Sequence, residues 1–148
     1  MYKTLYNNWL NSDKLSDKER EELKGISNDE KEIEYRFGKD LEFGTAGMRG
    51  LIGLGTNMLN VYIVMRATQG LAEYIKSLGE SAKKRGVVIS YDTRRMSYEF
   101  ACASALVLAT NGIKAYLFDE VHPVPMLSYA VIFFWVMACS YHNPCNSL

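Results

Sequence analysis

The chain has 148 residues, which is enough for one domain with a substantial core and too few for two ordinary domains. Its 17 basic residues balance its 17 acidic ones, so the charge pattern argues against nucleic acid or a membrane surface as a partner. The 3 cysteines cannot all pair within one chain, and the N-terminus lacks the apolar run of a signal peptide, which favours a cytoplasmic location. We therefore expect a small ligand bound at a local site.

Residues 1–38 are rich in charge and follow a helical pattern. Ser16 and Glu19 have the spacing of a capping box, and Gly25 can end the helix that they begin. We expect two or three short helices packed on one face, with the charged face in solvent and without a chemical role. The chain then divides into this helical leader, residues 1–38, and a domain over residues 39–148.

Residues 43–50 read Phe-Gly-Thr-Ala-Gly-Met-Arg-Gly, so glycines surround one hydroxyl, on Thr45, and one guanidinium, on Arg49. Glycine lets backbone N–H groups approach a ligand closely, and arginine offers a fork of donors that suits phosphate or carboxylate. The residues indicate a loop that binds an anion, while a turn that only connects two elements remains an equal alternative. The spacing matches neither a P-loop nor a dinucleotide-binding fingerprint.

A long helix is expected from Asn60, which can cap it, to Gly79, because apolar residues recur at helical spacing between them. The basic residues 83–85 are interpreted as a linker. A β-branched apolar run at residues 86–91 predicts a strand that is buried on both faces.

The next residues complete a βαβ unit. Ser97 can cap a helix that ends at Asn111 and Gly112, and residues 113–118 form a second strand. The crossover should be right-handed and the two strands parallel, so the fold class is α/β. Ligands collect at the carboxyl ends of such strands, where this chain places the loops 92–95 and 119–125.

The residues of these loops, and of the apolar stretch after them, indicate a function less clearly. Asp92 and Arg94 either form an ion pair that orders the loop or contact a substrate, and His122 is interpreted as a surface or capping residue. Residues 126–139 are apolar but fall short of a membrane span, so we expect a buried helix that runs into a strand.

Residues 40–50 closely resemble the opening motif of the α-D-phosphohexomutases, the phosphoglucomutase and phosphomannomutase family. The leader and the run Gly-Thr-Asn-Met at 55–58 are most similar to the phosphoglucomutase/phosphopentomutase branch. Residues 91–97 resemble the family's strand-end motif, and residues 124–131 resemble the proline-led helix before its catalytic strand. The resemblance implies a three-layer α/β/α domain with a mainly parallel, mixed sheet. It also implies an isomerase that transfers a phosphoryl group within a hexose or pentose phosphate, in carbohydrate metabolism.

The resemblance implies that Thr45, Arg49 and Arg94 contact phosphate or substrate. The family's phosphoserine aligns with Tyr141 when the match is anchored on His142, and Ser140 lies one residue earlier. A tyrosine oxygen lies about a ring's length farther from the backbone, and in an extended strand Ser140 faces the other side. Ser140, Tyr141 and His142 are the catalytic candidates, and we expect the isolated chain to be inactive.

The resemblance also implies Mg²⁺ and a sugar bisphosphate activator, but the family's aspartate-rich Mg²⁺ loop is absent from this sequence. Cys139, His142 and Cys145 are close together, yet unligated thiols explain them more simply than zinc does, so no metal site is expected. The alternative function is a non-catalytic fragment that binds phosphorylated sugar or pairs with another chain through an unfinished domain edge. An unrelated α/β domain that binds anions is a third alternative.

Overall fold

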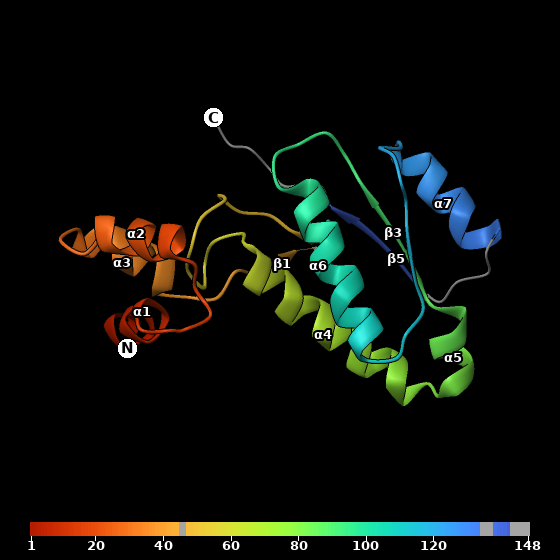
Figure 1. Cartoon of the computed structure of the whole chain (residues 1–148), viewed down its shortest axis with the longest axis horizontal. Helices are drawn as coiled ribbons and strands as arrows, with labels where there is room; N and C mark the ends of the chain where they lie inside the picture. Colours follow the sequence, from red (N-terminus) through yellow and green to blue (C-terminus); the bar gives the residue numbers. More distant parts are fainter. Residues whose placement is uncertain (45–46, 134–137, 143–148) are drawn as a thin grey trace. The chain divides into compact units, whose positions relative to one another are not determined.

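The computed structural model describes residues 1–44, 47–133 and 138–142. The chain forms two compact units, one over Met1–Ile63 and the other over the described residues from Val64 onward. The division falls within helix α4 (Val61–Ser77), and Figure 1 labels most of the elements of both units.

Three short helices form the leader, as the sequence predicts: α1 (Tyr2–Leu10), α2 (Asp17–Gly25) and α3 (Glu30–Phe37). Phe37 is only 1% exposed. The rings of Tyr6 and Trp9 meet it edge-on, with centroids 5.7 and 5.8 Å from that of Phe37. The leader is therefore held by an apolar core rather than by its charged face.

The predicted capping box begins α2. The Ser16 hydroxyl accepts a hydrogen bond from the Glu19 N–H at 3.4 Å, and the Glu19 carboxylate accepts one from the Ser16 N–H at 2.8 Å. Two of the N–H groups that a helix start leaves without partners are thereby satisfied.

The glycine-rich stretch forms a hairpin. Strands β1 (Phe43–Gly44) and β2 (Gly47–Met48) are antiparallel, with Phe43 opposite Met48 and Gly44 opposite Gly47. Residues 51–60, called the bracing segment here, fold back against its base. The N–H of Leu59 donates to the Leu51 carbonyl at 2.8 Å, and the N–H of Leu41 donates to the Thr56 carbonyl at 2.8 Å.

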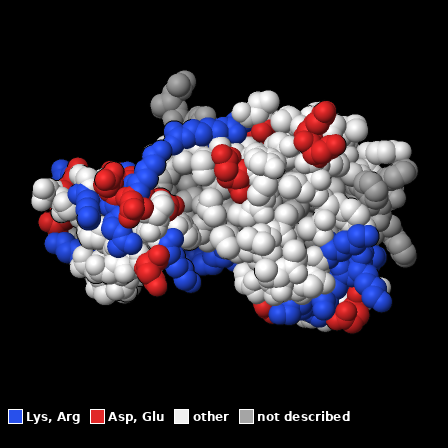
Figure 2. Space-filling model, viewed as in Figure 1, with Lys and Arg blue, Asp and Glu red and all other residues white. Residues whose placement is uncertain are grey.

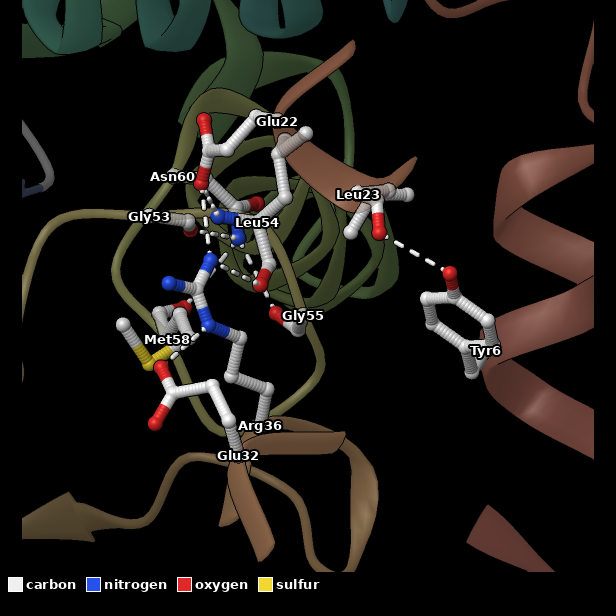
Figure 3. A network of polar contacts seen from close by, with 10 residues as sticks. All are labelled: Tyr6, Glu22, Leu23, Glu32, Arg36, Gly53, Leu54, Gly55, Met58 and Asn60. Atoms are coloured by element: carbon white, nitrogen blue, oxygen red, sulfur yellow. Dashed lines mark hydrogen bonds and ion pairs between the residues drawn. The ribbon is translucent and has the colours of Figure 1, made fainter. Parts of the chain in front are cut away.

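Asn60 holds the bracing segment and also begins α4 (Figure 3). Its amide nitrogen donates to the carbonyl oxygens of Gly53, Gly55 and Met58 at 2.9, 3.0 and 3.2 Å. Its amide oxygen accepts from the N–H of Ile63 at 3.0 Å, which confirms the predicted cap. A single buried side chain therefore fixes both the turn and the helix start.

The second unit has a three-stranded parallel sheet in the order β4-β3-β5 among the described residues. Its strands are β3 (Val87–Tyr91), β4 (Ala115–Leu117) and β5 (Ala138–His142). Helix α6 (Ser97–Thr110) lies between β3 and β4 in the sequence, which confirms the βαβ unit and its parallel strands.

Helices cover both faces of this sheet (Figure 1). On one face, Ile89 packs in a cluster with Ile75 of α4 and Leu108 of α6. On the other, Val88 packs against Leu127 and Ala130 of α7 (Val124–Phe133). Because side chains alternate along a strand, β3 is buried on both faces, and the α/β/α layering follows.

Two of the local predictions are wrong. Residues 83–85 are not a linker, because they form the end of helix α5 (Glu80–Arg85), in which Lys83 pairs with Glu80 at 2.8 Å. Ser97 is not the cap of α6, since Met96 occupies that position and the Ser97 hydroxyl accepts the N–H of Asp92 at 3.0 Å instead.

The predicted buried helix that runs into a strand is present as α7 followed by β5, but α7 is buried on one side only. Met126, Tyr129 and Ile132 are 45%, 61% and 79% exposed. Among the residues the structure describes, no helix is both long and apolar enough to cross a membrane.

Replacing Asn60 by alanine should lower the free energy of unfolding by about 2–4 kcal/mol, because it removes a helix cap and leaves buried carbonyls without donors. Asn60→Ser is the matched control, since serine restores the cap but cannot reach three carbonyls. In urea unfolding, the stability of the serine variant should lie between those of the alanine variant and the unaltered chain. Equal stability of all three proteins would contradict this role of Asn60.

Candidate functional site

The hairpin presents Arg49 immediately after β2, and its side chain is exposed. The next residue, Gly50, lies so close to Leu41 that a Cβ there would be 2.9 Å from the Leu41 Cδ1 atom. A larger residue at position 50 would require the Leu41 side chain to move. Thr45, the other predicted anion contact of this loop, lies outside the described residues.

Arg36 of α3 links the leader to the bracing segment (Figure 3). Its guanidinium forms ion pairs with Glu22 at 2.8 Å and Glu32 at 2.7 Å, and it donates to the Leu54 carbonyl at 3.5 Å. The Arg36 side chain is 15% exposed. Burial acts to lower the pKa of Arg36, but the hydrogen bonds to Glu32 and Glu22 outweigh it, so the net pKa is raised and the charge is secure.

In the second unit, the candidate residues lie where β3 ends. The Asp92 N–H donates to the Ser97 hydroxyl, and the Arg94 N–H donates to the Asp92 carboxylate at 3.0 Å. The Arg94 guanidinium lies 3.5 Å from the same carboxylate. The structure thus contains the predicted ion pair that orders this loop, and the Arg94 side chain is 44% exposed.

The strand that carries the catalytic candidates lies beside β3. In the parallel register, Ser140 is opposite Ile89, Tyr141 is opposite Ser90, and His142 is opposite Tyr91. His142 is therefore level with the last residue of β3, at the edge of the sheet from which the Asp92 loop leaves. The carboxyl ends of parallel strands meet at one edge, so the backbone brings these two predicted parts of the site together.

A third loop joins this edge. The Tyr91 hydroxyl donates to the Asp119 carbonyl at 3.1 Å, which ties the end of β3 to the loop after β4. In that loop the ring of His122 packs edge-on against Phe118, with centroids 4.9 Å apart. This contact gives His122 a packing role.

Basic side chains of the second unit gather elsewhere (Figure 2). Lys83, Lys84 and Arg85 lie in α5, which precedes the amino end of β3, and the visible surface over α6 is largely uncharged. The opposite ends of a strand are separated by its length, so these cations are far from the Asp92 loop. At the carboxyl edge the exposed arginine that the sequence singled out is Arg94.

Metal binding has little support in the described part of the chain. No group of three or more His, Cys, Asp or Glu side chains there is arranged to hold a metal ion.

Sequence reasoning missed two residues that shape the site. Arg36 was grouped with the solvated charges of the leader, although its spacing of four residues from Glu32 indicated a pair within α3. Met96 adopts a left-handed backbone, with φ 66° and ψ 0°, where the chain turns from the Asp92 loop into α6. No sequence signal indicated this, because methionine is not a residue that favours positive φ.

The three-layer fold, with loops gathered at the carboxyl ends of parallel strands, places the chain in the class of open-sheet α/β domains. Residues 40–146 match the model of the phosphoglucomutase/phosphomannomutase alpha/beta/alpha domain I. That match covers more than half of the chain, so the chain belongs to the phosphoglucomutase/phosphomannomutase family.

The relatives include a phosphoglucomutase of Staphylococcus haemolyticus, 40% identical over 115 residues, with 75% of this chain and 20% of the relative covered. A phosphoglucomutase of Staphylococcus epidermidis is 44% identical over 108 residues, with coverage of 70% and 19%. The phosphopentomutase of Mus musculus is 35% identical over 123 residues, with coverage of 76% and 20%. The chain thus spans about a fifth of the length of these relatives. No solved structure matches it.

At position 96 glycine should be more stabilising than alanine, by about 1 kcal/mol, because a Cβ is strained in the left-handed backbone. Comparing Met96→Gly with Met96→Ala by urea unfolding removes the effect of losing the methionine side chain, which both variants share. The control is the same pair of substitutions at the exposed helical residue Met126, where alanine should be the more stabilising. A Met96→Ala protein as stable as Met96→Gly would show that the turn is unstrained.

Proposed function

We propose that this chain is the N-terminal catalytic-domain segment of a phosphosugar mutase and that it binds a phosphorylated sugar at the hairpin 43–50. The observation that carries the proposal is an exposed Arg49 on a hairpin whose two ends are tied down by hydrogen bonds at Leu41 and Leu51. The guanidinium of an arginine on such a hairpin can pair with phosphate through two parallel hydrogen bonds. The mutase names of its relatives support the same substrate class.

The reaction of the whole protein is proposed as phosphoryl transfer within a hexose or pentose phosphate. In this mechanism Arg49 and Thr45 hold the phosphate, and Arg94 contacts substrate from the end of β3. His142 contributes from the end of β5, next to the position of the phosphoryl acceptor. These roles rest on the family resemblance and on the shared sheet edge of β3 and β5.

The acceptor position limits what the isolated chain can do. Tyr141 stands where the family resemblance implies a serine, and Ser140 is one residue away along β5. Phosphoryl transfer depends on the positions of the reacting oxygens, and a displacement of about 1 Å can cost ~100-fold in rate. We infer that the isolated chain binds phosphosugar but does not transfer the phosphoryl group.

The cofactors remain part of the proposal for the whole protein. The resemblance implies Mg²⁺ and a sugar bisphosphate activator, and no step described above uses a metal held by this chain. We propose a cytoplasmic location, in keeping with the three cysteines, which cannot all pair within one chain.

A second function has an observation in its favour. Helix α7 carries no charged residue, and Met126, Tyr129 and Ile132 are exposed along it. An uncharged exposed stripe of this kind is typical of a surface that another chain covers. A mass that rises with protein concentration in light scattering would support a chain-pairing role.

Substituting Arg49 by alanine should reduce the affinity for glucose 1-phosphate by at least tenfold, because the phosphate loses a charged pair of donors. Isothermal titration calorimetry of the whole chain measures the dissociation constant. The control is Lys84→Ala, since Lys84 is an exposed cation of α5 that has no part in the leader or the hairpin and should leave the affinity unchanged. Equal affinities of the Arg49→Ala variant and the unaltered chain would remove Arg49 from the site.

A further inference from the structure

We propose that Arg36 is a positioning residue for the anion-binding hairpin, and that the leader helices set the place of Arg49 through the bracing segment. This inference rests on the proposed function, because it concerns how the same hairpin is held. It gives the charged leader, which has no chemical role in the sequence interpretation, a part in ligand binding.

The first step is the contact between the leader and the bracing segment. One oxygen of the Glu22 carboxylate accepts from the Arg36 guanidinium at 2.8 Å and from the backbone N–H of Leu54 at 3.1 Å. The same guanidinium donates to the Leu54 carbonyl at 3.5 Å. Arg36 and Glu22 thus form hydrogen bonds with the carbonyl and the N–H of Leu54 in the bracing segment (Figure 3).

The backbone of Arg36 makes a second contact. Its carbonyl accepts from the N–H of Asn57 at 2.9 Å. Gly55 lies against the same carbonyl, with φ +136°, and a Cβ at that position would be 2.6 Å from the Arg36 oxygen. The end of α3 and the turn 53–57 therefore touch backbone to backbone, and only glycine allows that approach.

The second step leads from the bracing segment to the hairpin. The Thr56 carbonyl accepts the N–H of Leu41, and the Thr56 hydroxyl donates to the Lys39 carbonyl at 2.8 Å. On the other side of the hairpin, Leu59 donates to the Leu51 carbonyl. The chain end before the hairpin is therefore bonded to the segment that Arg36 holds, and the chain end after the hairpin runs directly into that segment.

The charges explain why Arg36 matters in this chain of contacts. Its guanidinium is mostly buried between two carboxylates, and removing one partner of such a pair leaves the others without compensation. Lysine cannot replace the fork, since a single ammonium does not match the geometry of both carboxylates. Without the Arg36 side chain, the Leu54 carbonyl loses a donor and Glu22 loses its counter-charge, which weakens the hold of α3 on the bracing segment.

The experiment compares Glu22→Gln and Arg36→Met with the control Glu30→Gln. Glu30 is also a leader glutamate in an ion pair, but its partners Lys3 and Tyr2 lie on α1. Affinity for glucose 1-phosphate is measured by calorimetry at a temperature where circular dichroism shows each variant to be folded. We expect Arg36→Met and Glu22→Gln to weaken binding by about tenfold and threefold, with Glu30→Gln unchanged. If Arg36→Met does not fold, Glu22→Gln decides the result.

A double-mutant cycle separates positioning from general stability. In an Arg49→Lys background, whose weakened binding is still measurable, Arg36→Met should cost little further affinity, because the group that it positions is already altered. The same tenfold loss in both backgrounds would overturn the inference, as would full affinity of the Arg36→Met and Glu22→Gln variants. If Arg49→Lys and Arg49→Ala both bind with full affinity, the proposed function fails, and the inference fails with it.

Discussion

A loop with three glycines among its eight residues, as at 43–50, is costly to order, because glycine loses more conformational entropy on ordering than other residues do. Its geometry has to be imposed at its two ends. In this chain the imposed constraint is the pair of backbone hydrogen bonds from Leu41 to Thr56 and from Leu59 to Leu51. Asn60 holds the bracing segment from within, by bonding three of its carbonyls, and Arg36 holds it from the leader. Arg49 owes its position to these contacts.

The second constraint is the parallel register of the sheet. Pairing of β5 with β3 sets His142 level with Tyr91, next to the loop that Asp92, Arg94 and Ser97 order among themselves. This register places the acceptor candidates Ser140 and Tyr141 within the strand, before the end of the sheet. The backbone thus places these candidates beside the Asp92 loop, and the residue types at 140 and 141 are the basis of our proposal that phosphoryl transfer does not take place in this chain.

Much of the fold could be predicted from local patterns. The capping box at Ser16, the helix cap at Asn60 and the buried strand at 87–91 depend on short-range rules, and the structure confirms all three.

The failures depend on tertiary contacts. Ser97 is of a residue type that caps helices, but the chain turns at Met96 and the Ser97 hydroxyl accepts the N–H of Asp92 instead. Residues 83–85 show no periodic apolar pattern and were therefore not predicted to be helical. They form the end of α5 because Ala82 is buried and because basic side chains are stabilising in the last turn of a helix. Helix α7 is apolar all round, so its sequence could not show which side meets the sheet. Arg49 and Arg94 could be singled out as candidates because arginine suits phosphate and because the motifs that contain them, at residues 40–50 and 91–97, resemble those of the family. Arg36 could not be recognised as a support of the hairpin, because Glu22 and Leu54 are distant in sequence and only its pair with Glu32 is local.

The central claim is that this chain retains the phosphate-binding hairpin of a phosphosugar mutase but not its phosphoryl acceptor. The most direct test is intact and tandem mass spectrometry of the purified chain after incubation with glucose 1,6-bisphosphate and Mg²⁺. The account predicts that the mass is unchanged and that the peptide containing Ser140 and Tyr141 carries no phosphate. A phosphate on either residue would contradict it, and would show that the altered strand still accepts the group.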